Sequence, residues 1–264
     1  MRDEPKVKRV IKIGGRVQSD VRLAGVLAQL WAKEPATFCV VHGGSGTISS
    51  LQRQLGRAPV FVDGRRVTSE GDIEVLRMAL SGVANKLLVD SLSTKGIAAA
   101  GVSGEDGSLI VARPMNAAVL GRVGVPVEVN DGVVRTLLAG GFLPIISPVA
   151  RDGETKRGGA LNVNADDAAA AIAAALDADE LLLISDVAGV IIDGVTAQRM
   201  SGNEAASAIE SGIATEGMAT KLRAALDALG RGVPHVRIGA LDALLDATLG
   251  TTIGTTRLAA PQPA

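Results

Sequence analysis

Short apolar runs alternate with segments of helical periodicity along almost the whole chain. The runs at residues 7–13, 38–41 and 180–185 are typical of buried strands. Between residues 69 and 94, isoleucine, leucine and valine recur at three- and four-residue spacing, which predicts one long helix that stops at Gly96. This alternation predicts an α/β fold: an open, mainly parallel sheet sandwiched by helices, with β-hairpins at one edge.

Local signals add detail to this prediction. Ser19 is expected to cap the helix that follows it, and Leu55 to face inward from the next helix. The Asp63-Gly64 pair predicts the turn of a small hairpin. A further buried strand is expected at 97–102, and the last core strand at 236–238.

No internal repeat or low-complexity linker divides the chain. At 264 residues and 47% hydrophobic content it can bury a sizeable core, either as one large domain or as two lobes. We place the boundary between an N-terminal lobe, residues 1–175, and a C-terminal lobe, residues 176–264.

Composition excludes several classes of function. A formal net charge of −1 argues against nucleic acid or an anionic membrane as partner, because such binding depends on an excess of Lys and Arg. No apolar run approaches the roughly 20 residues of a spanning helix, and residues 1–5 have no hydrophobic signal core, so we expect a cytoplasmic protein. With Cys39 as the single cysteine and His42 and His235 as the only histidines, little remains for a zinc site or a Ser/His/Asp triad.

Glycine pairs follow the first two predicted strands. The first strand ends in Lys12-Ile13-Gly14-Gly15 and the second in His42-Gly43-Gly44-Ser45-Gly46. With a helical pattern between them they predict one βαβ unit whose glycine loops meet at the same sheet edge, where main-chain N–H groups can bind phosphate. Neither loop matches the dinucleotide-binding or P-loop motifs, so the phosphate site is of another kind.

The order of several motifs carries a resemblance to a known family. The motifs are Ile11-Lys12-Ile13-Gly14-Gly15, His42-Gly43-Gly44, Gly64-Arg65-Arg66-Val67-Thr68, Gly121-Arg122-Val123-Gly124, Asn162-Val163-Asn164-Ala165-Asp166 and Gly217-Met218-Ala219-Thr220-Lys221. From about residue 8 to 255 the chain resembles the amino acid kinase family, and most closely its N-acetylglutamate kinase branch.

This resemblance implies a reaction. It implies transfer of the γ-phosphoryl group of ATP to the side-chain carboxylate of N-acetyl-L-glutamate, giving an acyl phosphate in arginine biosynthesis. The N-terminal lobe would bind the amino acid and hold the transfer site, and the C-terminal lobe would bind ATP. A carboxylate with a pKa near ~4 is already ionised and needs no catalytic base. The reaction needs cations and N–H donors, and Mg²⁺ held mainly by the phosphates rather than by a protein ligand set.

Three residues are expected to carry the catalysis. Lys12 and Lys221 are similar to the two catalytic lysines of the family, each neutralising one side of the transferring phosphoryl group. Asp166 is similar to the carboxylate that holds both lysines in position. Without the resemblance, Lys221 would be interpreted as a surface residue, and Asp166 as a carboxylate that favours the helix dipole.

Other residues are expected to bind the substrate and the phosphates. Arg66 matches the arginine that grips the α-carboxylate, for which a planar two-pronged donor suits better than lysine. Arg65 beside it is expected to face solvent. Asn162 resembles the asparagine that contacts the acylated amino acid, and His42 is expected to be a packed strand-end residue. Four glycines would supply the nearest N–H groups: Gly43 and Gly44 on the substrate side, Gly14 and Gly15 on the phosphate side.

Three departures from the family pattern keep alternatives open. Ser45 and Gly46 follow the second glycine pair where the N-acetylglutamate branch usually has a third glycine and a proline, and Glu216 precedes Gly217 in place of a glycine pair. Serine at this position is also found in related kinases whose aminoadipate or glutamate is held on a small acidic carrier protein, which would then be a partner. A noncatalytic ligand-binding protein on the same fold is the third reading, against which the retention of both lysines and Asp166 argues.

The resemblance also implies an assembly. The long helix at 69–94 resembles the element through which the family pairs its subunits. Six residues precede the first strand, too few for the N-terminal helix that links dimers into hexamers in arginine-inhibited members. We therefore expect a homodimer whose activity is insensitive to arginine.

Overall fold

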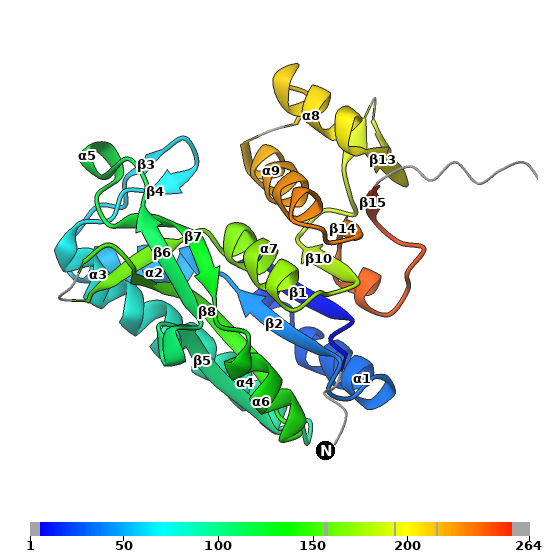
Figure 1. Ribbon diagram of the computed structural model, residues 1–264, viewed down its shortest axis with the longest axis horizontal. Helices are drawn as coiled ribbons and strands as arrows, with labels where there is room; N and C mark the ends of the chain where they lie inside the picture. Colours follow the sequence, from blue (N-terminus) through cyan, green and yellow to red (C-terminus); the bar gives the residue numbers. More distant parts are fainter. Residues whose placement is uncertain (1–5, 156–157, 193, 215, 255–264) are drawn as a thin grey trace, which may run out of the picture.

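An 11-stranded sheet runs through the molecule (Figure 1). The computed structural model describes residues 6–155, 158–192, 194–214 and 216–254. The strands of the sheet are β1 (Arg9–Ile13), β2 (Phe38–His42), β5 (Ala99–Gly104), β6 (Ile110–Pro114), β7 (Val123–Val129), β8 (Leu143–Asp152), β9 (Ala160–Val163), β10 (Glu180–Ile184), β13 (Arg199–Ser201), β14 (His235–Gly239) and β15 (Thr251–Gly254). Their order is β13-β15-β14-β10-β1-β2-β8-β6-β7-β9, with β5 paired to β8.

The pairing confirms the predicted sheet. The central ladders β14–β10, β10–β1, β1–β2 and β2–β8 are all parallel. Antiparallel pairs occur towards the ends of the sheet, between β14 and β15, β6 and β7, and β8 and β9. Two hairpins lie outside it: β3 (Phe61–Val62) with β4 (Arg65–Arg66), the hairpin expected around Asp63-Gly64, and β11 (Ile191–Ile192) with β12 (Val195–Thr196).

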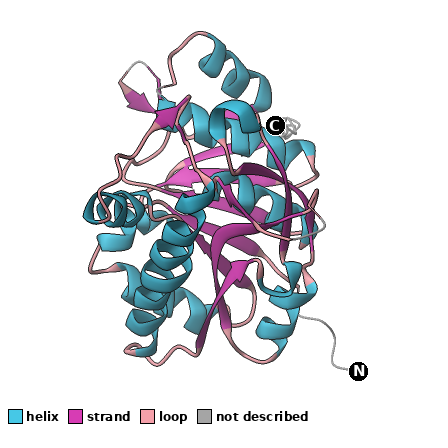
Figure 2. Ribbon diagram, turned by 90° about the vertical axis from the view of Figure 1, so that its left-hand side faces the viewer, coloured by secondary structure: helices cyan, strands magenta, loops and turns pink. Residues whose placement is uncertain are grey.

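Helices cover both faces of the sheet (Figure 2). One face packs against α6 (Gly132–Ala139), α7 (Ala165–Ala175) and α9 (Glu216–Gly230), with α8 (Gly202–Glu210) on α9. The other packs against α1 (Leu23–Lys33), α4 (Asn85–Ser93) and the 3₁₀ turn η4 (Leu241–Leu244). The remaining helical segments are η1 (Val17–Ser19), α2 (Ser45–Gln54), α3 (Glu70–Leu76), η2 (Arg77–Ala84), η3 (Asp106–Ser108) and α5 (Ala117–Leu120). Within the described ranges, no helix has the length and apolar character needed to cross a bilayer.

The alternation of β1 decides where its lysine points. Ile11 and Ile13 are fully buried in the apolar core with α1 and α4, whereas Val10 belongs to the core with α7. Because side chains alternate along a strand, Lys12 shares the face of Val10. A cation is thereby directed from the central strand toward the start of α7.

The alanine-rich helix α7 begins at a side-chain cap. The Asn164 side-chain oxygen accepts hydrogen bonds from the backbone N–H groups of Asp166 at 2.8 Å and Asp167 at 3.4 Å. These bonds satisfy N–H groups that have no partner inside the helix. The cap fixes the first turn, and with it the two carboxylates that follow.

The predicted long helix is continuous but not uniform. It runs through α3, η2 and α4, and opens with a capping box in which Ser69 and Asp72 exchange hydrogen bonds. The central segment η2, residues Arg77–Ala84, is a π-helix. Such segments are rare and occur frequently at functional sites.

Some local predictions were wrong. Ser19 lies in η1 and does not cap α1; the backbone N–H of Arg22 instead donates to Asp20 Oδ1 at 2.8 Å. Leu55 is 52% exposed, because α2 ends one residue earlier. The strand expected to be buried at 97–102 is β5, which is only partly buried because it pairs with β8 alone.

Candidate active site

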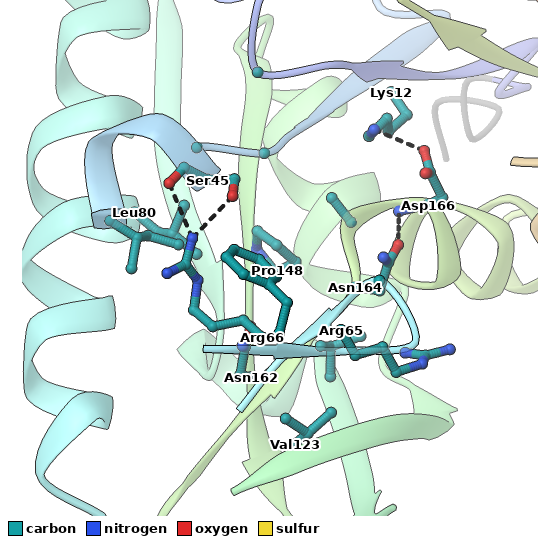
Figure 3. A pocket seen from close by; sticks show the side chains of 18 residues that line it. Lys12, Ser45, Arg65, Arg66, Leu80, Val123, Pro148, Asn162, Asn164 and Asp166 are labelled. Carbon is teal, nitrogen blue, oxygen red and sulfur yellow. Dashed lines mark hydrogen bonds and ion pairs between the residues drawn. The ribbon is translucent and has the colours of Figure 1, made fainter. Parts of the chain in front are cut away.

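A cavity of ≈ 200 Å³ lies where the glycine loops after β1 and β2 meet the β3–β4 hairpin (Figure 3). The parallel strands of the sheet end at this edge, where ligands bind in open α/β folds. The structure brings most of the predicted site residues to its wall: Lys12, Gly15, Gly43, Gly44, Arg66, Asn162 and Asp166.

Two lysines converge on one buried carboxylate beside this cavity. Lys12 Nζ lies 2.7 Å from Asp166 Oδ1, and Lys221 Nζ, from α9, lies 3.5 Å from Oδ2. The side chains of Asp166, Lys12 and Lys221 are only 5%, 7% and 15% exposed. The three groups come from β1, α7 and α9, so the packing of α7 on both β1 and α9 assembles them.

The charged groups of this cluster shift one another's pKa values. Burial alone would raise the pKa of Asp166, but Lys12 and then Lys221 outweigh it and hold that pKa below its usual value. For Lys221, burial and the repulsion from Lys12 lower the pKa, and Asp166 opposes them. The cluster thus keeps an ionised carboxylate between its two cations.

Arg66 is held in one orientation by a polar face of α2. Its Nη1 donates to Gln52 Oε1 at 2.6 Å, and its Nη2 donates to the Ser45 and Ser49 hydroxyls, each at 2.9 Å. The guanidinium also lies 4.6 Å from the centre of the Phe61 ring. Burial lowers its pKa, which Asp72 partly counteracts, so the site presents a desolvated cation with a fixed direction.

Sequence reasoning missed the residues that hold Arg66. Ser45, Ser49 and Gln52 follow one another at spacings of four and three, so they share one side of the helix. A polar stripe at that spacing, beside the inward-facing Ile48, was the signal available in the sequence.

The prediction that Arg65 faces solvent was wrong. Arg65 lines the cavity, and its Nη2 lies 2.8 Å from Asp167 Oδ2. Arg65 and Arg66 point to opposite sides of β4, but the hairpin lies over the cavity, so both sides meet protein. Burial raises the pKa of Asp167, and Arg65 opposes this rise.

Asn162 lies in β9, shortly before the start of α7. Its Nδ2 donates to Thr68 Oγ1 at 2.9 Å, and Thr68 Oγ1 donates in turn to the carbonyl of Arg66 at 3.0 Å. This chain of bonds joins the floor of the cavity to the arginine hairpin.

The four predicted glycines are not equivalent. The N–H of Gly14 donates to the Ile184 carbonyl at 2.8 Å, and that of Gly43 to the Ile13 carbonyl at 3.2 Å, so both serve the strand ladders. Among hydrogen bonds between described residues, none is donated by the N–H of Gly15 or Gly44. A Cβ atom at Gly44 would lie 2.6 Å from Leu80 Cδ2, so any other residue there would require the Leu80 side chain to shift.

Buried cations and available N–H donors at the carboxyl edge of a parallel sheet define a phosphotransferase of the α/β class. The chain belongs to the amino acid kinase family, whose sequence profile matches residues 8–240. It is 38% identical over 230 residues to the acetylglutamate kinase of Geobacillus stearothermophilus, covering 87% of this chain and 88% of that protein. It is 41% identical over 227 residues to the acetylglutamate kinase of Rubrobacter xylanophilus, covering 85% and 86%. Among solved structures, smu.665 of Streptococcus mutans superposes with a TM-score of 0.81 at 29% identity, covering 94% of this chain and 98% of that one.

Proposed function

We propose that this protein is an N-acetylglutamate kinase. It would transfer the γ-phosphoryl group of ATP to the side-chain carboxylate of N-acetyl-L-glutamate, forming the acyl phosphate used in arginine biosynthesis. The observation that carries the proposal is the Lys12–Asp166–Lys221 cluster beside a small cavity that also holds Arg66. The acetylglutamate kinases among its relatives support the choice of substrate.

Electrostatic stabilisation is the main task of such a site. The accepting carboxylate is ionised at neutral pH, so the obstacle is the approach of an anion to a polyanion. Lys12 Nζ and Lys221 Nζ neutralise the oxygens of the transferring group from two sides, while Asp166 keeps the two ammonium groups from moving apart. The N–H groups of Gly15 and Gly44 donate to the same oxygens, as preorganised donors that need no rearrangement.

The amino-acid substrate binds in the cavity. Arg66 binds the α-carboxylate of the amino acid with those guanidinium N–H groups that are not bonded to α2. Asn162 contacts the acylated amide. At ≈ 200 Å³ the cavity suits a small molecule, and its lining lies within residues 12–166. We therefore assign amino-acid binding to the lobe of residues 1–175. ATP binding falls to residues 176–264, which supply Lys221.

Mg²⁺ would reach the site with the nucleotide. Asp166, the carboxylate among the residues that line the cavity, is committed to two lysines, so the ion would be held mainly by phosphate oxygens and water, which suits its chemistry. There it would neutralise phosphate charge that the lysines do not reach.

We also propose that two copies of the chain pair through the long helix. Met78, Val83 and Leu87 on this helix are all exposed, which is costly for an unpaired apolar surface. Light scattering on the wild type and on a Val83→Glu/Leu87→Glu variant tests this: the wild type should have the mass of a dimer and the variant that of a monomer. A monomeric wild type would contradict it.

The decisive assay for the reaction uses purified protein with Mg-ATP and hydroxylamine, which traps acyl phosphates. Turnover is expected on N-acetylglutamate and little on free glutamate, aspartate or α-aminoadipate, and a reaction without protein is the control. Turnover only after addition of a carrier protein would move the assignment to the carrier-dependent kinases. No turnover on any of these would favour a noncatalytic binding protein.

A further inference from the structure

The peptide between Gly43 and Gly44 is held by side chains that do not touch the cavity. The Gly43 carbonyl accepts hydrogen bonds from His42 Nδ1 at 2.8 Å and from Gln18 Nε2 at 2.9 Å. The N–H of Gly43 is fixed to Ile13. A glycine pair has an unusually free backbone, so these three bonds determine its direction.

The hydrogen-bond network around His42 defines its tautomer. Asn85 Nδ2 lies 3.0 Å from His42 Nε2 and 2.9 Å from the Ile145 carbonyl, while Asn85 Oδ1 accepts from Lys86 Nζ at 3.1 Å. The Asn85 amide therefore donates to Nε2, which leaves the ring proton on Nδ1 to be donated to Gly43. Burial lowers the pKa of His42 to about 4, so the ring is neutral at physiological pH.

The fold makes room for this network. Asn85 follows the π-helical segment directly, and Leu80 and Ala84 of that segment pack against Gly44. On the other side, a Cβ atom at Gly101 would lie 1.9 Å from Asn85 Oδ1, so only glycine at that position of β5 leaves space for the amide. The π-helical segment before Asn85 and the space left by Gly101 thus both allow the Asn85 amide to lie against His42.

The direction of the Gly43 carbonyl decides where the next N–H points. A trans peptide is planar, and its C=O and N–H point in opposite directions. The carbonyl of Gly43 points to Gln18, which lies outside the substrate cavity, and Gly44 lines that cavity. We propose that Gln18 and His42 are positioning residues that turn the Gly44 N–H toward the transferring phosphoryl group, with Asn85 holding His42.

This inference rests on the proposed kinase activity, and it gives two residues a role that the sequence analysis did not. His42 is 0% exposed and does not line the cavity, so it does not exchange protons with the substrate. Its action is confined to the peptide that it holds.

A first experiment removes one bond at a partly buried position. Gln18→Met keeps the length of the side chain and deletes the donor, and Gln29→Met on the exposed side of α1 is the matched control. In the hydroxamate assay Gln18→Met should lower kcat about ten-fold, less than the roughly 10²–10³ lost when such a donor is deleted, because the Gly44 N–H remains. The KM values for ATP and N-acetylglutamate and the melting temperature should stay near those of the control. An unchanged kcat would overturn the proposal.

A second experiment separates donating from filling space at position 42. His42→Asn places an amide donor near the Nδ1 position, whereas His42→Leu fills more of the buried volume with an apolar side chain. If His42 orients the peptide, His42→Asn retains several-fold more kcat than His42→Leu even where it melts at a lower temperature. The reverse order of kcat would assign His42 to packing alone. A wild type without activity on N-acetylglutamate would instead refute the proposed function, so the two failures are distinguishable.

Discussion

Replacing Asp166 with asparagine tests the charge cluster most directly. The Asp166→Asn side chain keeps the shape of the carboxylate but removes the negative charge that lies between Lys12 and Lys221. Both lysines are more than four-fifths buried, so water cannot take over the role of the carboxylate. The variant is left with two ammonium groups that repel each other in a desolvated site.

The size of the effect follows from these distances. At 2.7 Å and an effective dielectric constant near ~20, the gross attraction between Lys12 and Asp166 is about 6 kcal/mol. Breaking a buried pair by removing one partner costs about 3–5 kcal/mol net. Lys221 is the more exposed lysine and can turn toward solvent, so we expect the lower end, about 3 kcal/mol. For a chain of 264 residues this corresponds to a loss of roughly 5 °C in melting temperature.

The assay is thermal unfolding followed by circular dichroism at pH 7. Asp167→Asn is the matched control. Burial raises the pKa of Asp167, so its ionised form is less favoured than that of Asp166, and the stability lost on its replacement should be the smaller of the two. A Lys12→Met/Asp166→Asn protein should recover at least half of the lost stability. If Asp166→Asn is no less stable than Asp167→Asn, or if the double variant recovers nothing, the charge argument is wrong.

The same cluster has a defined pH dependence. Because the folded pKa of Asp166 is depressed, its stabilisation is fully present above the unfolded pKa near ~3.9 and is lost as pH falls through the folded pKa. The difference in melting temperature between the wild type and Asp166→Asn should therefore narrow below about pH 4. A difference that stays constant there would contradict an ionic origin.

Further predictions concern single side chains. Lys12→Ala or Lys221→Ala should lower kcat by about 10²–10³ with smaller changes in KM, and near-normal kcat in either would remove that lysine from the mechanism. Burial and the repulsion from Lys12 lower the pKa of Lys221, so kcat should fall as pH rises and the charged form is lost, and Lys221→Arg should move that fall to higher pH. Arg66→Lys should raise the KM for the amino acid more than it lowers kcat, since a point charge replaces a two-pronged donor; a change confined to kcat would speak against substrate binding. Burial raises the pKa of Cys39 to about 12, so thiol reagents should label it only after denaturation, and rapid labelling of the native protein would contradict its burial.

The parts of the fold that the sequence predicted are those set by local periodicity. The long helix and the hairpin around Asp63-Gly64 were expected at their observed places. The strand β15 was missed, since two threonines, an isoleucine and a glycine give no strong hydrophobic pattern, and its partner β13 lies far away in the sequence. Ser19 was the wrong cap because Asp20, one residue later, already bonds the backbone of the helix start.

The candidate site likewise has features that local motifs predicted and features that depend on contacts between distant parts of the chain. The motifs indicated which residues would gather at the cavity, including Lys12 and Asp166, although their functional roles stay predictions. Arg65 could not be placed from the sequence, because its environment depends on Asp167, a residue 102 positions away. The engagement of the Gly14 and Gly43 N–H groups in strand ladders likewise depends on strand register, which a glycine motif does not specify.

The position of β1 decides whether the chain can be divided into two separately folding fragments. All five of its residues are paired to β2 on one side and to β10 on the other, so the first described strand connects the sheet across the lobe boundary that we proposed near residue 175. A gene cut at that boundary would encode two fragments, each with a parallel strand edge bared along its length. Neither fragment is a module that recombination could move alone, and the two would regain a native sheet only by folding together.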